Sequence, residues 1–408
     1  MILFIHQNFP GQFMHVTRAL HAAGTHKLLA LTSSANQRSP LVPVRHYHWR
    51  STERAESSPG KHYAECASRG AAVADALLGL KAEGLTPDLV IGHGGWGETL
   101  FVRDVWPDTP LLLHAEFFYR GHGLDVGFDP ETSPPDLTRT TRLARARSVV
   151  MLQALTDASH GVAPTHWQAD TFPACLRQKI DVIHEGIDTG IAVPNPAASL
   201  TLRRDGVHLP PGDEVVTYVA RNLEPYRGFH IFMRTLPAIL AARPNARIII
   251  VGGDGVSYGP RPAPERTWRQ VLLKELAGRL DMTRVHFVGR VPHVRFIELM
   301  QLSAAHVYLT YPFVLSWSML EAMSAGALVI GSRTGPVEEV IEGGRNGVLR
   351  DFFDVAGIAD AVIQALAEPA RFMAIRRAAR QTVLDRYDLK RICLPAWLNL
   401  IDRVAAMR

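Results

Sequence analysis

The sequence predicts an α/β protein with two domains in tandem, each built on a doubly wound parallel sheet. In both halves, short apolar runs alternate with longer amphipathic stretches, which is typical of parallel strands connected by helices. The alternation stops in a segment with four prolines, residues 193–214, and restarts after it. The length of 408 residues suits two domains of ordinary size.

In the first half, the apolar runs predict five strands, at 2–5, 27–32, 88–93, 110–117 and 181–186. Helices are expected at 11–23, 62–82 and 140–157, where apolar residues recur at helical spacing. The segment at 193–214 has no helical period, so we interpret it as an interdomain linker.

In the second half, strands are expected at 214–220, 246–253, 284–290, 305–310 and 327–332. Helices are expected near 228–242, 265–280, 293–303, 316–325 and 335–342, and throughout the tail from about 356. The predicted domains are residues 1–192 and 205–380, with helices at 381–408 that cross back onto the first domain. We expect a ligand at the carboxyl ends of the strands, in the cleft between the domains.

Composition excludes several classes of protein. Apolar residues make up 47% and charged residues 20%, which argues against extended disorder. The formal charge of +5 fits an anionic ligand or an anionic membrane surface, but a nucleic-acid binder should carry a denser basic stripe. Three scattered cysteines predict neither a disulfide framework nor a CxxC metal site. With no signal peptide or membrane-spanning run expected, we predict a cytoplasmic protein with at most peripheral membrane contact.

Gly11 and Gln12 lie in the motif HQNFPGQ, directly after the first predicted strand. A glycine there lets backbone N–H groups approach a phosphate at the start of the next helix. A plain tight turn is the alternative. A second motif, RNLEPYRG, follows the first strand of the second half and contains Arg221 and Arg227. Two guanidinium groups beside a turn suit a diphosphate, whereas the alternative is a solvated loop with two surface arginines.

Glu321 lies in a third motif, YPFVLSWSMLEAMSAG, which we place at the start of an otherwise apolar helix. The two oxygens of its carboxylate suit the vicinal hydroxyls of a ribose. A glutamate that caps the helix N-terminus is the alternative.

These motifs, with GGDG at 252–255, RVHFVGRVP at 284–292, LEAMSAGALVIGS at 320–332 and GPVEEVI at 335–341, resemble the nucleotide-sugar half of a GT-B glycosyltransferase. Within that class the chain resembles glycosyltransferase family 4, whose members retain the anomeric configuration. HQNFPGQF, DLVIGHGGWGE and VIHEGID extend the resemblance over essentially the whole chain.

The resemblance implies roles for particular residues. Arg221 and Arg227 occupy the places of an Arg and a Lys that hold the donor diphosphate, and Glu321 that of a glutamate that binds the ribose. Gly11 and Gln12 match the glycine loop near the diphosphate. The remaining donor-binding positions are Arg290 and Val291 near the base and Phe313, Leu315 and Ser316 in the loop before Glu321, while Gly335 and Glu339 match the following turn.

Two positions depart from the family pattern. Phe313 stands where the family has a glutamate that contacts the transferred sugar. Glu116 stands where the strand starting at Pro110 usually delivers a catalytic histidine, with His114 two residues earlier. Because side chains of a strand alternate, Glu116 and His114 should share one face, and His93 is a third candidate. We expect Glu116 to contact the reacting sugar, unless it forms a structural ion pair with Arg120.

The resemblance therefore implies a retaining glycosyltransferase that moves a sugar from a UDP- or GDP-sugar to a hydroxyl acceptor, such as a glycan or a lipid-linked intermediate of surface polysaccharide synthesis. A catalytically silent nucleotide-sugar binding subunit and an epimerase or hydrolase of the same fold are the alternatives. We expect no cofactor and no metal, because arginines and helix N-termini can meet the charge of the diphosphate. Asp254 in GGDG is the nearest metal-ligand contender.

Overall fold

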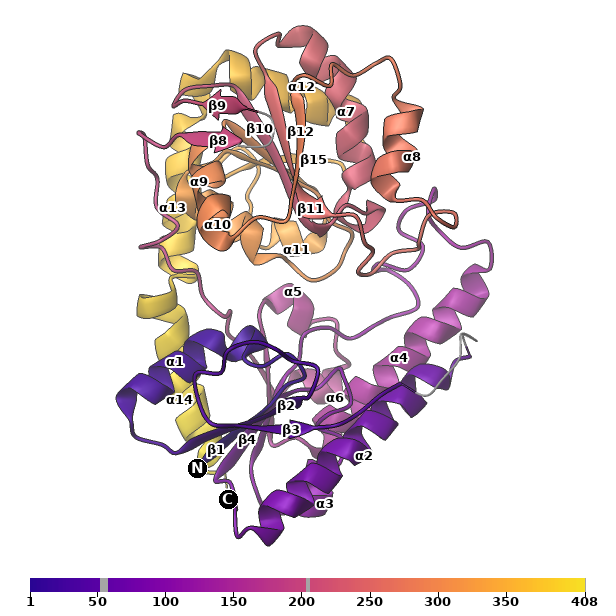
Figure 1. The fold of residues 1–408 in the computed structure, drawn as a ribbon, viewed down its shortest axis with the longest axis vertical. Helices are drawn as coiled ribbons and strands as arrows, with labels where there is room; N and C mark the ends of the chain where they lie inside the picture. The colour runs from indigo at the N-terminus through magenta and orange to yellow at the C-terminus, as the bar shows by residue number, and fades with distance from the viewer. Residues whose placement is uncertain (52–57, 203–205, 408) are drawn as a thin grey trace. The chain divides into compact units, whose positions relative to one another are not determined.

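The computed structural model describes residues 1–51, 58–202 and 206–407, which form two compact units (Figure 1). Unit 1 comprises Met1–Gly127, Ser133–Gly186 and Leu389–Arg408, and unit 2 comprises Phe128–Thr132 and Ile187–Asp388. Each unit is built on its own parallel sheet with helices on both faces, which confirms the predicted fold class. The predicted domain limits at 192, 205 and 380 stay predictions. Contacts divide the chain after residues 127, 132, 186 and 388.

Unit 1 has a seven-stranded sheet in the order β3-β2-β1-β4-β5-β6-β7, and every pair is parallel. The central strands are fully buried apolar runs, as expected for a sheet covered on both faces. The strands are β1 (Ile2–Ile5), β2 (Leu28–Ser33), β3 (Val44–Tyr47), β4 (Leu89–His93), β5 (Leu111–His114), β6 (His160–Ala163) and β7 (Ile180–Val182).

Alternate residues of β1 serve the two cores of unit 1. Leu3 and Ile5 pack in the core that contains helices α2 and α4, whereas Ile2 and Phe4 pack in the core that contains α1 and α14. The helical segments are η1 (Gly11–Phe13), α1 (Met14–Ala23), α2 (Lys61–Ala82), α3 (Val102–Val105), α4 (Leu137–Asp157), α5 (His166–Ala169), α6 (Ala174–Arg177), the π-helical η4 (Leu389–Cys393) and α14 (Leu394–Ala405).

Helix α14 ends the chain but contributes to the core of unit 1, beside α1 (Figure 1). Its apolar face buries Trp397, Leu400, Ile401 and Val404. The predicted continuous helical tail is wrong at Tyr387 and Asp388, because helix α13 ends in a turn at Tyr387 and Asp388 forms a parallel bridge with Ile187. Among the described residues, no helix is long and apolar enough to cross a membrane.

Unit 2 has a six-stranded parallel sheet in the order β12-β11-β10-β13-β14-β15. Its strands are β10 (Val215–Asn222), β11 (Arg247–Gly253), β12 (Val285–Gly289), β13 (Ala305–Tyr308), β14 (Val329–Ser332) and β15 (Val348–Arg350). Its helices are η2 (Pro225–Arg227), α7 (Phe229–Ala242), α8 (Trp268–Glu275), α9 (His293–Leu302), α10 (Trp317–Ala325), α11 (Gly335–Glu338), α12 (Val355–Ala367), η3 (Pro369–Phe372) and α13 (Met373–Arg386).

The interpretation of residues 193–214 as a linker is wrong for its described part. Strands β8 (Leu200–Leu202) and β9 (Val207–Leu209) pair antiparallel, and residues 203–205 lie outside the described residues. Leu200, Leu202 and Leu209 are buried in the core of unit 2. This pair of strands belongs to unit 2 because its alternate apolar residues are buried in the core of that unit.

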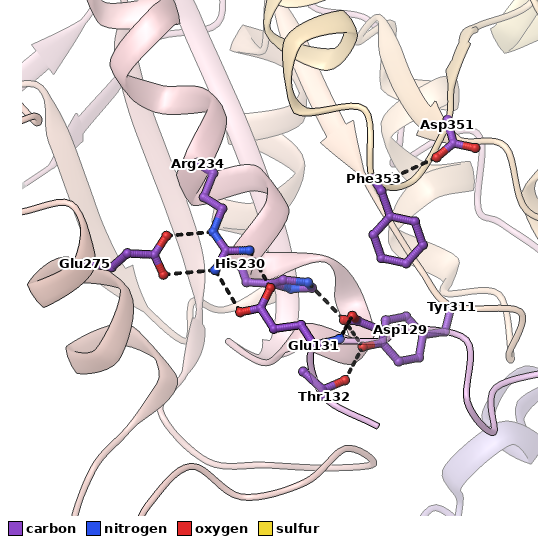
Figure 2. Close-up of polar contacts among 9 residues, drawn as sticks. All are labelled: Asp129, Glu131, Thr132, His230, Arg234, Glu275, Tyr311, Asp351 and Phe353. Atoms are coloured by element: carbon purple, nitrogen blue, oxygen red, sulfur yellow. Dashed lines mark hydrogen bonds and ion pairs between the residues drawn. The ribbon is translucent and has the colours of Figure 1, made fainter. Parts of the chain in front are cut away.

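A short segment at 128–132, which we call the strap, packs in unit 2 although its neighbours in the chain belong to unit 1. The ring of Phe128 packs against Tyr311, Phe352 and Phe353. Figure 2 shows the polar contacts: Asp129 meets His230 and Tyr311, Glu131 meets Arg234, and Thr132 meets Tyr311. Arg234 also holds Glu275 of α8. The strap is therefore fixed to unit 2 by both aromatic and charged contacts.

Candidate active site

A histidine stands at the carboxyl end of each of three adjacent strands of unit 1. His6 directly follows β1, and His93 and His114 are the last residues of β4 and β5. Because parallel strands end at one edge of the sheet, the rings form a row. The centroids of His6 and His93 lie 6.1 Å apart, edge to face, and those of His93 and His114 lie 5.2 Å apart, stacked.

Backbone N–H groups fix the tautomer of two of these rings. The N–H of Asn8 donates to Nδ1 of His6, and the N–H of Gly95 donates to Nδ1 of His93, each at 3.0 Å. Since Nδ1 accepts in both rings, the hydrogen of each neutral imidazole is on Nε2. Burial lowers the pKa of His93 and lowers that of His6 to about 3, so both rings are neutral near pH 7.

Two glutamates complete the cluster. Oε2 of Glu116 lies 3.6 Å from Nε2 of His93, and Oε1 of Glu185 lies 2.8 Å from Nε2 of His114. The side chain of Glu116 is 29% exposed, whereas that of Glu185 is 4% exposed. The cluster therefore holds two carboxylate–imidazole pairs, one reaching solvent and one buried.

Both glutamates are ionised in this setting. Burial by itself would raise the pKa of Glu116, but His93, together with His114 and His6, outweighs burial and lowers this pKa to about 2. For Glu185, burial is likewise outweighed by the hydrogen bond from His114, and its pKa lies below the ordinary value. Each carboxylate thus faces an imidazole N–H.

Gly11 lies against the ring of His6. A Cβ at Gly11 would stand 2.6 Å from Cε1 of His6, and the residue has φ +51°. Gln12, the next residue, is half-buried in the 3₁₀ helix η1. The glycine that the sequence associates with a phosphate is therefore also required by packing, because no other residue leaves room for this ring.

The structure brings Glu116, His114 and His93 together, but β5 ends at His114, so Glu116 follows the strand instead of lying on it. The alternative pairing of Glu116 with Arg120 is wrong. The Arg120 guanidinium donates to the carbonyls of Thr171 and Asp170.

Sequence reasoning gave no role to Glu185, which stands in the motif VIHEGID, or to the His6 ring. A partial signal was present, because a histidine directly follows the predicted strand 2–5, ends the predicted strand 88–93 and lies within the predicted strand 110–117. The pairing of His114 with Glu185 had no signal, since 71 residues separate them.

In unit 2, Arg227 ends η2, just after the carboxyl end of β10. Its Nη1 donates to Oγ1 of Thr310 at 2.8 Å and to the carbonyl of Val314 at 2.9 Å. The guanidinium lies 5.9 Å from the ring of Phe313. Arg227 is thus fixed to the loop that carries the predicted donor residues.

Within that loop, Phe313 and Leu315 are buried. Phe313 packs edge to face on Tyr226 and against Tyr258, with centroids 5.2 and 4.9 Å away. Ser316 is the N-cap of α10. The position that usually carries a glutamate therefore belongs to an aromatic cluster beside Arg227.

Arg221 is exposed near the end of β10, one residue before Asn222. Arg290, which follows β12, donates to Oδ1 of Asn222 at 3.0 Å, and Val291 packs partly buried against the core. The structure thus places Arg290 beside the strand end that carries Arg221.

Glu321 is the fifth residue of α10, so the expected position at the helix start is wrong and the capping alternative is excluded. Its Oε1 pairs with Nε2 of His293 at the start of α9, at 2.5 Å. This hydrogen bond raises the pKa of His293. The carboxylate therefore already has one imidazole partner. Gly335 begins α11, and Glu339 is the residue that follows it.

Asp254 forms a 2.9 Å ion pair with Arg269. In the part of the chain that the structure describes, no group of three or more His, Cys, Asp or Glu side chains is arranged to hold a metal ion. What these units do offer is cationic and hydrogen-bonding groups at strand ends, where α/β folds bind their ligands.

Two family models match the chain. A model of the glycosyl transferase family 4 group matches residues 24–192, and a model of glycosyl transferases group 1 matches residues 203–382. Together with the two parallel sheets, these matches define a GT-B glycosyltransferase. More specifically, the N-terminal half belongs to the glycosyl transferase family 4 group and the C-terminal half to glycosyl transferases group 1.

The curated relatives share 26% of their residues with this chain over the matched regions. A glycogen synthase of Mycobacterium tuberculosis (strain CDC 1551 / Oshkosh) is 26% identical over 231 residues, covering 54% of this chain and 51% of that protein. A D-inositol 3-phosphate glycosyltransferase of Nocardioides sp. (strain ATCC BAA-499 / JS614) is 26% identical over 317 residues, covering 70% and 63%. The chain thus spans between half and two thirds of the length of these relatives.

Among solved structures, Anabaena Alr3699/HepE in complex with UDP matches with a TM-score of 0.66 and 18% identity, over 98% of this chain and 99% of that one. At this identity the likeness shows the fold alone.

Proposed function

We propose that the chain transfers a sugar from a nucleoside diphosphate sugar to a hydroxyl acceptor. The observation that carries this proposal is the placement of Arg227, at a strand end of unit 2 and fixed by Thr310 and Val314 to the donor loop. A guanidinium held in this way is preorganised for the charge that grows on a departing diphosphate. HepE, which shares the fold, has been solved with UDP and with UDP-glucose, which supports UDP as the nucleotide to test first.

In this proposal the residues of unit 2 hold the donor. Arg227 and Arg221 neutralise the diphosphate, and Glu321 accepts hydrogen bonds from the ribose hydroxyls. Glu321 can do this because a carboxylate accepts several hydrogen bonds. The ribose hydroxyls can therefore donate to Glu321 while its Oε1 keeps the contact with His293. Arg290 and Val291 adjoin the base.

The residues of unit 1 act on the transferred sugar. Glu116 accepts a hydrogen bond from a sugar hydroxyl or supports positive charge that develops at the anomeric carbon. We propose retention of configuration, in which the leaving phosphate oxygen takes the proton of the acceptor hydroxyl. The bond from the anomeric carbon to that phosphate breaks, and a new bond to the acceptor oxygen forms on the same face.

The proposal extends to a hexosyl donor, a glycan or lipid-linked acceptor of surface polysaccharide synthesis, and a cytoplasmic protein that needs no metal. The proposed independence of metal follows from the cationic side chains at the strand ends of unit 2.

The test is incubation of the purified chain with radiolabelled UDP- and GDP-sugars and a panel of hydroxyl acceptors, with and without excess EDTA. Transfer to an acceptor, with the anomeric configuration of the donor and at the same rate in EDTA, is the expected result. Epimerised donor, free sugar or nucleotide binding alone would each contradict transfer. Loss of activity in EDTA that Mn²⁺ restores would contradict only the metal independence.

A further inference from the structure

Solvent exposure distinguishes Glu116 from the histidines of the cluster. The side chain of Glu116 is 29% exposed, whereas those of His93 and His114 are 2% and 1% exposed. A sugar can therefore touch Glu116 directly, but it reaches the buried rings only through the residues in front of them.

We propose that His93 is a positioning residue that aims Glu116 and keeps it ionised for the transferred sugar. This inference rests on the proposed function. It gives His93 a role through Glu116 in place of contact with the sugar.

The first support is the fixed direction of the His93 hydrogen. Nδ1 of His93 accepts the N–H of Gly95 at 3.0 Å, so the ring hydrogen is on Nε2, which faces Oε2 of Glu116 at 3.6 Å. A Cβ at Gly95 would stand 3.1 Å from Cε1 of His93, so a side chain there would press on the ring. Contacts of this kind are often long without substrate and shorten when it binds.

The second support is the wall behind His93. The ring of His114 stacks on His93 with centroids 5.2 Å apart, and Oε1 of Glu185 holds Nε2 of His114 at 2.8 Å. A ring packed between a hydrogen-bonded backbone and a second fixed ring keeps one orientation. The Nε2 hydrogen of His93 therefore keeps its direction toward Oε2 of Glu116.

The third support is the set of imidazole groups around the carboxylate. The groups that face Glu116 are His93 from β4, His114 from β5 and His6 after β1. Among the residues described, the Gln168 amide donates to the backbone carbonyl of Glu116, which fixes the main chain while leaving the carboxylate to the histidines.

Two substitutions separate this role from a merely structural one. The amide of Asn can replace Nδ1 as an acceptor for Gly95 but offers no donor at the place of Nε2. The amide nitrogen of Gln reaches the place of Nε2 and can still donate to Glu116. If His93 positions Glu116, His93→Gln should keep transfer within about fivefold of the unsubstituted chain, and His93→Asn should lower kcat about 10- to 100-fold at unchanged KM for the donor. If His93 only closes the turn, the order of the two variants reverses.

A double-mutant cycle with Glu116→Gln tests whether His93 acts through Glu116. We expect the double variant His93→Asn/Glu116→Gln to be no slower than Glu116→Gln alone, because the interaction is already lost. Multiplied losses would overturn the proposal. His160→Asn is the matched control, since His160 forms a similar pair with Asp181, at 3.4 Å, elsewhere on the sheet, and it should transfer at the unsubstituted rate.

A second measurement keeps the inference testable without activity. In carbon-13 NMR of labelled glutamate, assigned with Glu116→Gln, the Glu116 carboxylate should titrate at higher pH in His93→Asn than in the unsubstituted chain. It should stay low in His93→Gln. If no donor is transferred at all, the proposed function fails while this titration still decides the inference, and an unchanged Glu116 pKa in His93→Asn overturns it.

Discussion

The phenol of Tyr311 donates a 2.5 Å hydrogen bond to Oδ2 of Asp129, although 182 residues separate the two in the chain (Figure 2). The same oxygen lies 3.0 Å from Nε2 of His230, and both side chains of that pair are 1% exposed. Tyr311 belongs to the loop that Arg227 holds through Thr310 and Val314. The strap is therefore part of the support of the predicted donor loop.

Replacing Asp129 by Asn should destabilise unit 2 by about 2 kcal/mol at pH 7. Burial would raise the pKa of Asp129, but the hydrogen bonds from His230 and Tyr311 lower it to about 2. Because the folded pKa lies below the unfolded value, this stabilisation is complete above about pH 5 and is lost as the pH falls toward 2. Urea unfolding at several pH values measures the effect, with Asp360→Asn on the exposed face of α12 as the control. A stability difference between Asp129→Asn and the unsubstituted chain that did not narrow at low pH would contradict the assignment.

Glu321→Gln should weaken UDP binding by roughly 1.5–3 kcal/mol, because a charge-assisted hydrogen bond to the ribose is lost. Isothermal titration calorimetry with UDP and GDP measures the change. Glu298→Gln is the control, since Glu298 is also a glutamate paired with a basic residue of α9, Arg295 at 2.6 Å. Equal affinity of Glu321→Gln and the unsubstituted chain for both nucleotides would remove the ribose role.

Arg227→Ala should lower kcat by about 100-fold, which is the usual effect of removing one donor that stabilises developing charge. Arg227→Lys should retain more activity, because the charge stays even though the two hydrogen bonds from Nη1 to Thr310 and Val314 are lost. Arg243→Ala, which breaks the pair with Glu214, is the control. If Arg227→Ala raised only KM for the donor and left kcat intact, Arg227 would serve ground-state binding alone.

Gly11→Ala should destabilise unit 1 by about 1–3 kcal/mol, since the residue has φ +51° and a Cβ would collide with the His6 ring. Gly24→Ala is a matched control, because Gly24 has φ +64° but nothing within 4 Å of its Cβ position. The excess cost of Gly11→Ala over Gly24→Ala in urea unfolding measures the collision. Equal costs would show that backbone conformation alone demands the glycine.

Most strands and the longer helices could be predicted from the sequence, because their signals are local, although the short strands β3, β6 and β15 were not predicted. Buried runs such as Ile2–Ile5 and Leu89–His93, and the longer helical periods between them, announce a parallel sheet without reference to distant residues. The linker prediction at 193–214 was wrong because its prolines suggested a linker. The leucines of the short strands β8 and β9 are recognised as core residues only from their packing in unit 2.

The motifs also determined which segments carry the chemistry. Arg227, Glu321, His114 and Glu116 all lie at or soon after strand ends or on the helix that follows the donor loop, as their places in the sequence suggested. Family membership follows from such segments in their order, and this order is a property of the sequence alone.

Only the tertiary structure decided which groups act on one another. Glu116 faces His93 instead of Arg120, His114 faces Glu185, and residues 128–132 join unit 2 instead of the unit that surrounds them in the chain. Each of these outcomes depends on side chains tens to hundreds of residues apart, and on which of them burial leaves exposed. Such contacts form when the strand ends come together at one edge of the sheet. A local sequence pattern therefore cannot predict them.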